Sequence, residues 1–161
     1  YQIGDTLLTL PGNPKHLDSY TSVAKNPDVK LAVMAGTVEL GYARAASIKD
    51  SQILQVPDTT AQLQAVRSHR ADAAVGTALT MKDLAAKMPG QVVAVDKFVD
   101  DPKHMGYGAL AFRKDDTDLR DAVDKQLHAW LGTPDHLQTV APFGFDKSNV
   151  TDKTAAELCR E

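Results

Sequence analysis

The residues with the clearest potential for binding chemistry form a glycine turn, Gly36-Thr37-Val38. The apolar run Leu31–Met34 before it predicts a buried strand, and the pattern at 38–46 predicts a helix. The first N–H groups of a helix have no partner within the helix, and the helix dipole favours negative charge there. Gly36 lets a ligand approach the backbone closely, and the Thr37 hydroxyl can add a hydrogen bond. This turn therefore predicts a seat for a small anionic group, most simply a carboxylate.

The same turn has a purely structural interpretation, as an ordinary connection in which Thr37 caps the helix, since Thr and Gly are common at helix starts. A second such turn, Gly76-Thr77, follows an apolar run at 71–75 and precedes a helical pattern at 79–88. In open α/β sheets, ligands bind beyond the carboxyl ends of the strands, where the strand order switches. Because both turns follow strands, we expect them to line one site, while a capping role for Gly76-Thr77 stays open.

The elements that would position these turns alternate between short apolar strands and helices. This rhythm predicts an α/β fold with a doubly wound, mainly parallel sheet and flanking helices. Strands are expected at residues 1–10, 31–34, 53–56, 71–75, 91–95 and 106–112. Helices are expected at residues 17–24, 38–46, 60–69, 79–88, 119–131, 135–140 and 154–159. The helix at 60–69 is expected to have an apolar side with Leu63, Ala65 and Val66 and a polar side with Gln62, Gln64 and Arg67.

Length and composition limit the class of protein. The chain has 161 residues, 43% of them hydrophobic, which is enough for one domain with a core or one lobe of a larger protein. Its net charge is −3 and the charges are interspersed, so no basic patch indicates nucleic acid as a partner. No apolar segment approaches the roughly 20 residues that span a bilayer. The single cysteine, Cys159, is either a free thiol or half of a bridge to a cysteine elsewhere.

No combination of residues predicts a metal centre, a cofactor site or a catalytic group. A Ser-His-Asp order, a pair of carboxylates within one turn and a phosphate-binding loop are all missing. This weighs against an enzyme, although catalytic groups could lie outside the sequence in hand. Metal-ligand spacing is also missing among the five histidines, which are His16, His69, His104, His128 and His136.

Four further residues have structural interpretations. Glu39 is expected to complement the dipole in the first turn of its helix rather than contact a ligand. Tyr42 and Trp130 lie within helical patterns and are expected to pack against neighbouring elements. Asp72 is expected to have a structural role directly before a buried strand.

The order and spacing of these elements resemble the second half of an extracytoplasmic solute-binding protein of the polar-amino-acid type, the receptor of an ABC importer. Four stretches carry the resemblance: GDTLLTLPGNPKHLDSYTSVAKNP, KLAVMAGTVELGYAR, VPDTTAQLQAVRSHRADAAVGTALTMKDLA and YGALAFRKDDTDLRDAVDKQLHAW. The resemblance implies a hinge-crossing strand at 1–14 and a periplasmic-binding-protein-like, ligand-binding lobe at 15–105. It also implies that 106–161 form a return hinge strand and C-terminal helices that pack on the other lobe.

Three shorter stretches, VELGYARA, APFGF and TAAELC, are most similar to ectoine- and hydroxyectoine-binding proteins. General amino-acid binders usually have Asp, which takes the ligand ammonium, where this chain has Thr77. The missing acid argues against a plain α-amino acid, whereas the delocalised charge of ectoine suits aromatic faces. The resemblance implies that Gly36, Thr37 and Val38 hold the ligand carboxylate and that Gly76 and Thr77 line the opposite side of the pocket.

The resemblance also implies a first-lobe segment of roughly a hundred residues before Tyr1, the size of a small domain. That segment would carry an aromatic cage, an arginine and a disulfide partner for Cys159. The predicted function is a periplasmic or extracytoplasmic receptor, with lipid anchoring left open, that captures a small zwitterion by hinge closure and delivers it to a membrane permease. The alternatives are a polar-amino-acid-binding protein, the effector domain of a transcription regulator, and a periplasmic dehydratase on the same fold.

Overall fold

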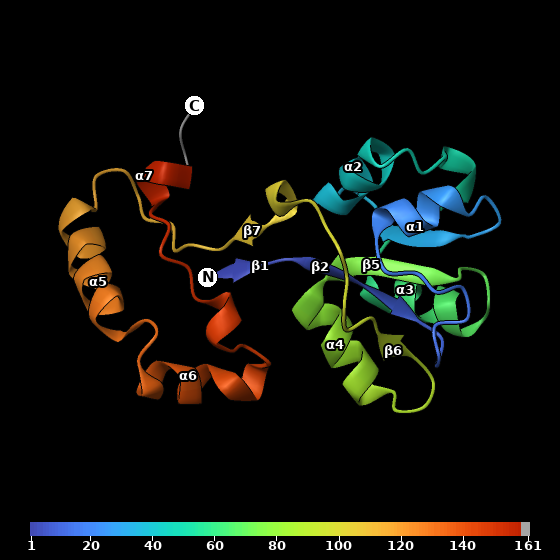
Figure 1. Ribbon diagram of the computed structural model, residues 1–161. Coiled ribbons are helices and arrows are strands. Elements are labelled where there is room, and N and C mark those ends of the chain that lie inside the picture. Colours follow the sequence, from blue (N-terminus) through green and yellow to red (C-terminus); the bar gives the residue numbers. More distant parts are fainter. Residues whose placement is uncertain (159–161) are drawn as a thin grey trace. The chain divides into compact units, whose positions relative to one another are not determined.

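The protein, seen in a computed structural model, is described over residues 1–158 and divides into two compact units (Figure 1). The sheet unit is Gly4–Met105, and the terminal unit comprises Tyr1–Ile3 and the chain from Gly106 onwards. The chain therefore passes between the units twice, after Ile3 and after Met105.

The sheet unit is built on a five-stranded sheet with the order β4-β3-β5-β2-β6. Its strands are β2 (Asp5–Thr9), β3 (Leu31–Met34), β4 (Ile53–Val56), β5 (Ala73–Thr77) and β6 (Val93–Ala94). Strand β3 is parallel to β4 and β5, whereas β2 is antiparallel to β5 and β6. Four strands thus share one direction and β2 opposes them, which confirms the predicted α/β fold with a mainly parallel sheet.

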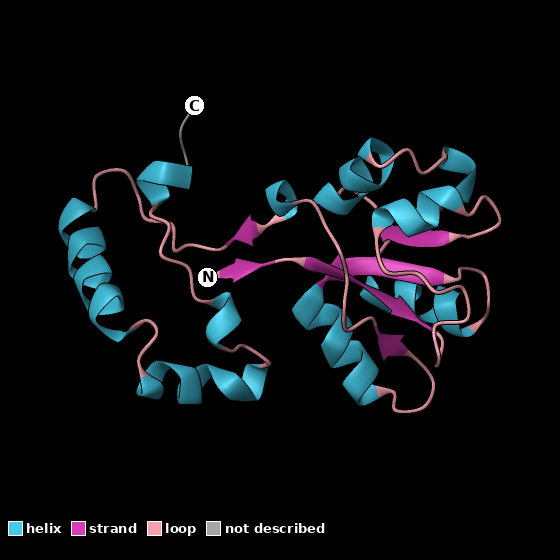
Figure 2. Ribbon diagram, viewed as in Figure 1, coloured by secondary structure: helices cyan, strands magenta, loops and turns pink. Residues whose placement is uncertain are grey.

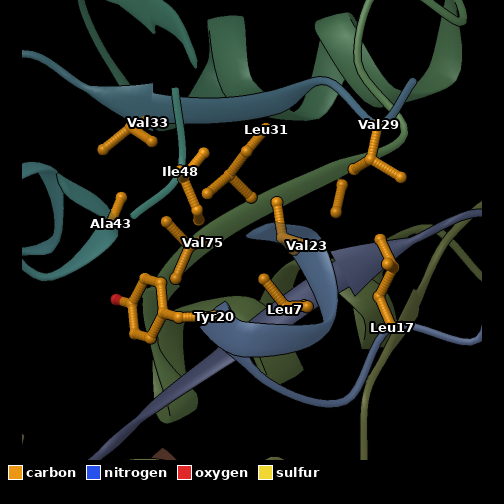
Figure 3. Packing of buried hydrophobic residues seen from close by; sticks show 11 residues of the cluster. Leu7, Leu17, Tyr20, Val23, Val29, Leu31, Val33, Ala43, Ile48 and Val75 are labelled. Atoms are coloured by element: carbon orange, nitrogen blue, oxygen red, sulfur yellow. The ribbon is translucent and has the colours of Figure 1, made fainter. Parts of the chain in front are cut away.

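Helices cover both faces of this sheet (Figure 2). They are α1 (Tyr20–Lys25), α2 (Val38–Ala45), α3 (Thr59–Arg67) and α4 (Ala78–Lys87). Successive side chains of a strand point to opposite faces, so Leu7 and Leu8, both fully buried, enter different clusters. Leu7 packs with residues of α1 and α2, including Tyr20 (Figure 3), and Leu8 packs with residues of α3 and α4, including Met81.

The terminal unit has little buried apolar surface. Strand β1 (Gln2–Ile3) pairs antiparallel with β7 (Gly106–Tyr107), and the helices are α5 (Thr117–Trp130), α6 (Pro134–Val140) and α7 (Ala155–Leu158). The strand predicted at 106–112 is too long, because β1 offers only two residues as partners. None of the residues of α5 is buried, so its apolar side chains are at least partly exposed. Cys159 and the predicted end of the last helix lie outside the described residues.

The remaining short elements are single 3₁₀ turns at Asp50–Gln52, Pro102–His104, Ala141–Phe143 and Lys147–Asn149. Among residues 1–158, no helix has the length and apolar character needed to cross a membrane.

Candidate functional site

The two predicted turns lie at the same edge of the five-stranded sheet. Strands β3 and β5 are parallel neighbours in the register Leu31↔Ala73, so their carboxyl ends point the same way. Gly36-Thr37 follows β3, and Gly76-Thr77 ends β5. We call this side of the sheet the carboxyl edge. It is also where the strand order switches, since the chain leaves β3 towards β4 and then returns past it to β5.

A buried glutamine separates β3 from β5 near this edge. The pairing of these two strands covers Leu31 and Ala32 and does not continue beyond them. The side chain of Gln62 from α3, 2% exposed, donates from Nε2 to the Ala32 carbonyl at 3.3 Å and to the Val75 carbonyl at 2.8 Å. The prediction that Gln62 shares a polar side of its helix with Gln64 and Arg67 is therefore wrong, because Gln62 is buried whereas the other two are exposed. Its amide replaces the missing strand pairing with hydrogen bonds of its own.

The N-terminus of α2 has unpaired donors and open space. Gly36 has a φ of +79°, and a Cβ added there would meet nothing within 4 Å. Thr37 is the N-cap residue, but its hydroxyl donates to the Met34 carbonyl at 3.0 Å and makes no side-chain cap. Val38 is 64% exposed. The capping interpretation of Thr37 thus accounts for its position but not for its hydroxyl. Among residues 1–158, no side chain accepts from the first-turn amides of α2.

The second turn is more enclosed. Gly76 and Thr77 belong to β5, which reaches two residues further than predicted because β2 pairs with it as far as Thr77. A Cβ on Gly76 would lie 2.7 Å from Cε of Met81. Thr77 is the N-cap residue of α4 and makes no side-chain cap, and its hydroxyl lies 2.8 Å from that of Thr80.

Replacing Gly76 with alanine is expected to lower the free energy of unfolding by about 1–2 kcal/mol through overpacking. The reason is that Met81, 1% exposed, has little room to move away from the new methyl group. Urea unfolding followed by circular dichroism measures the change. In a Met81→Ala background the same substitution is expected to cost less, since the clashing group is gone. Equal losses in the two backgrounds would contradict a clash with Met81.

Next to Thr77 lies a carboxyl group that the sequence analysis did not single out. Asp5 is directly opposite Thr77 in the antiparallel register of β2 and β5. Its Oδ2 accepts a hydrogen bond of 2.7 Å from the Tyr20 hydroxyl. Burial raises the pKa of Asp5 from its ordinary 3.8 to about 6; the Tyr20 hydrogen bond opposes this, and the charges of Glu39 and Asp100 add to it. Burial and Asp5 also raise the pKa of Tyr20, which keeps its proton as the donor.

Tyr20, which donates to this carboxyl group, belongs to a group of packed rings. Tyr42 stacks on His104 with ring centroids 3.7 Å apart, and Tyr20 meets both rings edge-on. Nδ1 of His104 lies 2.5 Å from Oδ1 of Asp100. The prediction that Tyr42 packs against neighbouring elements is confirmed.

Three carboxyl groups, Asp5, Glu39 and Asp100, together form what we call the acidic cluster. Glu39 lies in the first turn of α2 as expected, yet it is 8% exposed and has no hydrogen bond to another described residue. Oδ2 of Asp100 is buried and also lacks a partner among residues 1–158. One signal in the sequence could have revealed Asp5: it is the single charged residue of its strand, at the head of four uncharged residues.

The prediction made for Asp72 can be compared with the structure. Asp72 has the expected structural role, since its Oδ2 accepts from the Lys30 amide at 2.8 Å. Within the described residues, no group of three or more His, Cys, Asp or Glu side chains could hold a metal ion.

The mainly parallel sheet, the helices on both its faces and the two turns at its carboxyl edge define a lobe of the periplasmic-binding-protein-like class. The chain is similar to a probable amino-acid ABC transporter periplasmic-binding protein, y4tE, of Sinorhizobium fredii. The two are 31% identical over 162 residues, which is 97% of this chain and 53% of the relative. The chain thus spans about half the length of this curated relative. No family model matches it.

Solved structures agree with this similarity. The structure of EhuB in complex with hydroxyectoine matches 99% of this chain and 62% of its own, with a TM-score of 0.78 and 28% identity. The ancestral amino-acid-binding protein AncCDT-1, described as a precursor of cyclohexadienyl dehydratase, matches 80% of this chain and 53% of its own, with a TM-score of 0.61 and 30% identity. The resemblance to extracytoplasmic solute-binding proteins of the polar-amino-acid type is therefore confirmed.

Proposed function

We propose that the chain is part of the solute receptor of an ABC importer and that it binds a small zwitterion at the carboxyl edge of its sheet. The observation that carries this proposal is the pair of turns at the ends of β3 and β5, each of which begins a helix without a side-chain cap. Helix N-termini of this kind are ready sites for anions. The similarity to a probable amino-acid ABC transporter periplasmic-binding protein supports the transport function.

In this proposal the ligand carboxylate accepts hydrogen bonds from the Gly36-Thr37-Val38 turn, and Gly76 and Thr77 line the opposite side. A second lobe would close over the bound ligand, and the closed form would present a surface to a membrane permease outside the cytoplasm. The lobe assignments predicted from the sequence (1–14, 15–105 and 106–161) are part of the same proposal.

The uncovered face of α5 supports a place for a further segment. A hollow along this helix is lined by Ala122, Val123, Gln126, Leu127 and Trp130. Leu119, on the same helix, is 56% exposed. An amphipathic helix is normally stabilised by packing its apolar side against another element. We infer that first-lobe residues outside this chain cover α5 in the whole receptor.

Two ligand classes are supported to the same degree. The solved structure of EhuB contains hydroxyectoine, which favours ectoine and hydroxyectoine. The relative from Sinorhizobium fredii is a probable amino-acid binder, which favours a polar amino acid. Calorimetric titration of the full-length protein with ectoine, hydroxyectoine, L-arginine and L-glutamine separates them, and failure to bind any of these or other polar amino acids would refute the proposal.

The role of the α2 amides can be tested by removing one of them. Val38 is the first residue of α2, where proline is tolerated because that N–H has no partner in the helix. Thr37 before it is extended, with φ −97° and ψ 162°, as a residue preceding proline should be. Val38→Pro is expected to weaken ligand binding about tenfold, the effect of roughly one lost hydrogen bond to a charged group. Val38→Ala keeps the N–H and is the matched control; equal affinities of the two variants would exclude the turn as the anion seat.

A dehydratase on this scaffold is the second candidate. It is favoured by the description of AncCDT-1 as a dehydratase precursor and by the raised pKa of Asp5, as expected of a carboxyl that transfers protons. Nuclear magnetic resonance of the ligand during prolonged incubation distinguishes the two, since a receptor leaves its ligand unchanged.

A further inference from the structure

The acidic cluster faces the carboxyl edge from three elements. Asp5 lies at the head of β2, directly across from Thr77. Residues directly opposite in an antiparallel pair point to the same face of the sheet, so the Asp5 carboxyl and the Thr77 side chain leave the sheet together. Glu39 comes from the first turn of α2, next to the amide turn, and Asp100 from the segment before the second crossing.

The cluster contains more negative groups than positive ones. The groups that face Asp5 are Tyr20 from α1, Glu39 and Tyr42 from α2, and Asp100 and His104 from the segment after β6. In the described part of the chain, His104 is the only basic residue in a salt bridge with any of the three carboxyl groups. Glu39 is more than nine-tenths buried and has no hydrogen-bond partner there.

Ionised acids at such depth are unfavourable unless a cation balances them, and otherwise they tend to bind a proton. Oδ1 of Asp5 accepts no hydrogen bond from a described residue, and Asp5 is only partly buried. The stacked rings of Tyr42 and His104 add an aromatic wall. These features together suit a positively charged group.

We propose that Asp5 selects the ligand by charge: its carboxylate, backed by Glu39 and Asp100, takes the cationic part of the molecule whose carboxylate lies on the Gly36-Thr37-Val38 turn. This inference rests on the function proposed above. The lobe then presents two poles, helix amides for the anionic end of a zwitterion and the acidic cluster for its cationic end. A ligand with a net negative charge would meet repulsion from Glu39 beside the turn.

The structure also alters the argument made from Thr77. Thr77 stands where general amino-acid binders have an aspartate. The lack of an acid at this position argues against a plain α-amino acid as ligand only if no other acid lies nearby. Asp5 supplies that acid from the neighbouring strand. The class of ligand is therefore any small zwitterion or cation with a carboxylate, and L-arginine and ectoine both remain within it.

The test compares Asp5→Asn with Asp50→Asn in the full-length protein, using L-arginine and ectoine as probes. Both substitutions remove one negative charge. Asp50 pairs with Arg44, is 77% exposed and precedes β4, at the opposite edge of the sheet. Asn at position 5 keeps an acceptor for the Tyr20 hydroxyl, so the fold should persist, and Asp5→Glu restores the charge. Asp5→Asn is expected to weaken binding tenfold or more and Asp50→Asn less than twofold, since only Asp5 meets the ligand charge.

A second measurement separates charge recognition from a structural role. A bound cation lowers the pKa of Asp5, so at pH 6 wild-type protein should release protons on binding, seen as a buffer-dependent binding heat. Asp5→Asn should release fewer protons. If wild-type protein binds a probe and Asp5→Asn binds it equally well, with the same proton release, this inference is wrong and the receptor function stands. If wild-type protein binds neither probe nor any other small zwitterion, both are wrong.

Discussion

Replacing Gln62 with methionine is expected to lower the free energy of unfolding by about 3 kcal/mol, the largest effect that we predict. Methionine is similar in length and fills the same space, but it has no donor. The carbonyls of Ala32 and Val75 would then both lose the buried hydrogen bond that the Gln62 amide donates. Each such group costs about 1–3 kcal/mol, and the apolar side chain recovers part of that loss. Urea unfolding followed by far-ultraviolet circular dichroism measures the difference.

The matched control is Gln64→Met in the same helix. Gln64 is exposed, and its side chain makes no hydrogen bond in the described chain. The same chemical change should therefore alter stability by less than about 0.5 kcal/mol, as is usual at the surface. Similar losses at positions 62 and 64 would show that helix propensity, and not the bridge between β3 and β5, governs the result.

The buried position of Gln62 could not be predicted from the sequence, whereas two of the neighbouring strands could. Local patterns predicted β3 and β4 with the bounds that they have, because an apolar run between turn residues has few other ways to fold. The same approach placed Gln62 on a polar side, because it assumes that polar side chains face water. An amide buried between two separated strands depends on a long-range arrangement that periodicity does not contain.

Part of the candidate site was also predictable from the sequence, and part was not. The turns at Gly36 and Gly76 were predicted because glycine and a helix start are local signals. Asp5 was missed because its importance comes from pairing with β5, which follows it by a long stretch of chain. Strand register of this kind is set by tertiary packing and not by the strand alone. The terminal strand at 106–112 was overestimated for a related reason, since its length is limited by the two residues of β1.

Asp5→Asn is expected to make the protein more stable at neutral pH, although the same change weakens ligand binding. The pKa of Asp5 is about 6 in the folded chain, compared with its ordinary 3.8, so the folded state holds this proton more tightly than the unfolded state does. The bound proton makes its full contribution to the free energy of unfolding below pH 3.8, and this contribution is lost as the pH rises through 6. The rise of the pKa from 3.8 to about 6 corresponds to a loss of about 3 kcal/mol, and solvent screening of the partly exposed Asp5 reduces it to about 1–2 kcal/mol.

Asparagine has no proton to lose in this range, so its advantage over aspartate should appear between pH 4 and 6 and stay constant above pH 6. Urea unfolding of both proteins from pH 3.5 to 8 gives this profile, with Asp50→Asn as the control that has no such step. An Asp5→Asn variant less stable than wild type at pH 8 would contradict the assignment. A carboxylate that lowers stability and whose removal weakens binding is best explained by function, because stability alone would favour the amide.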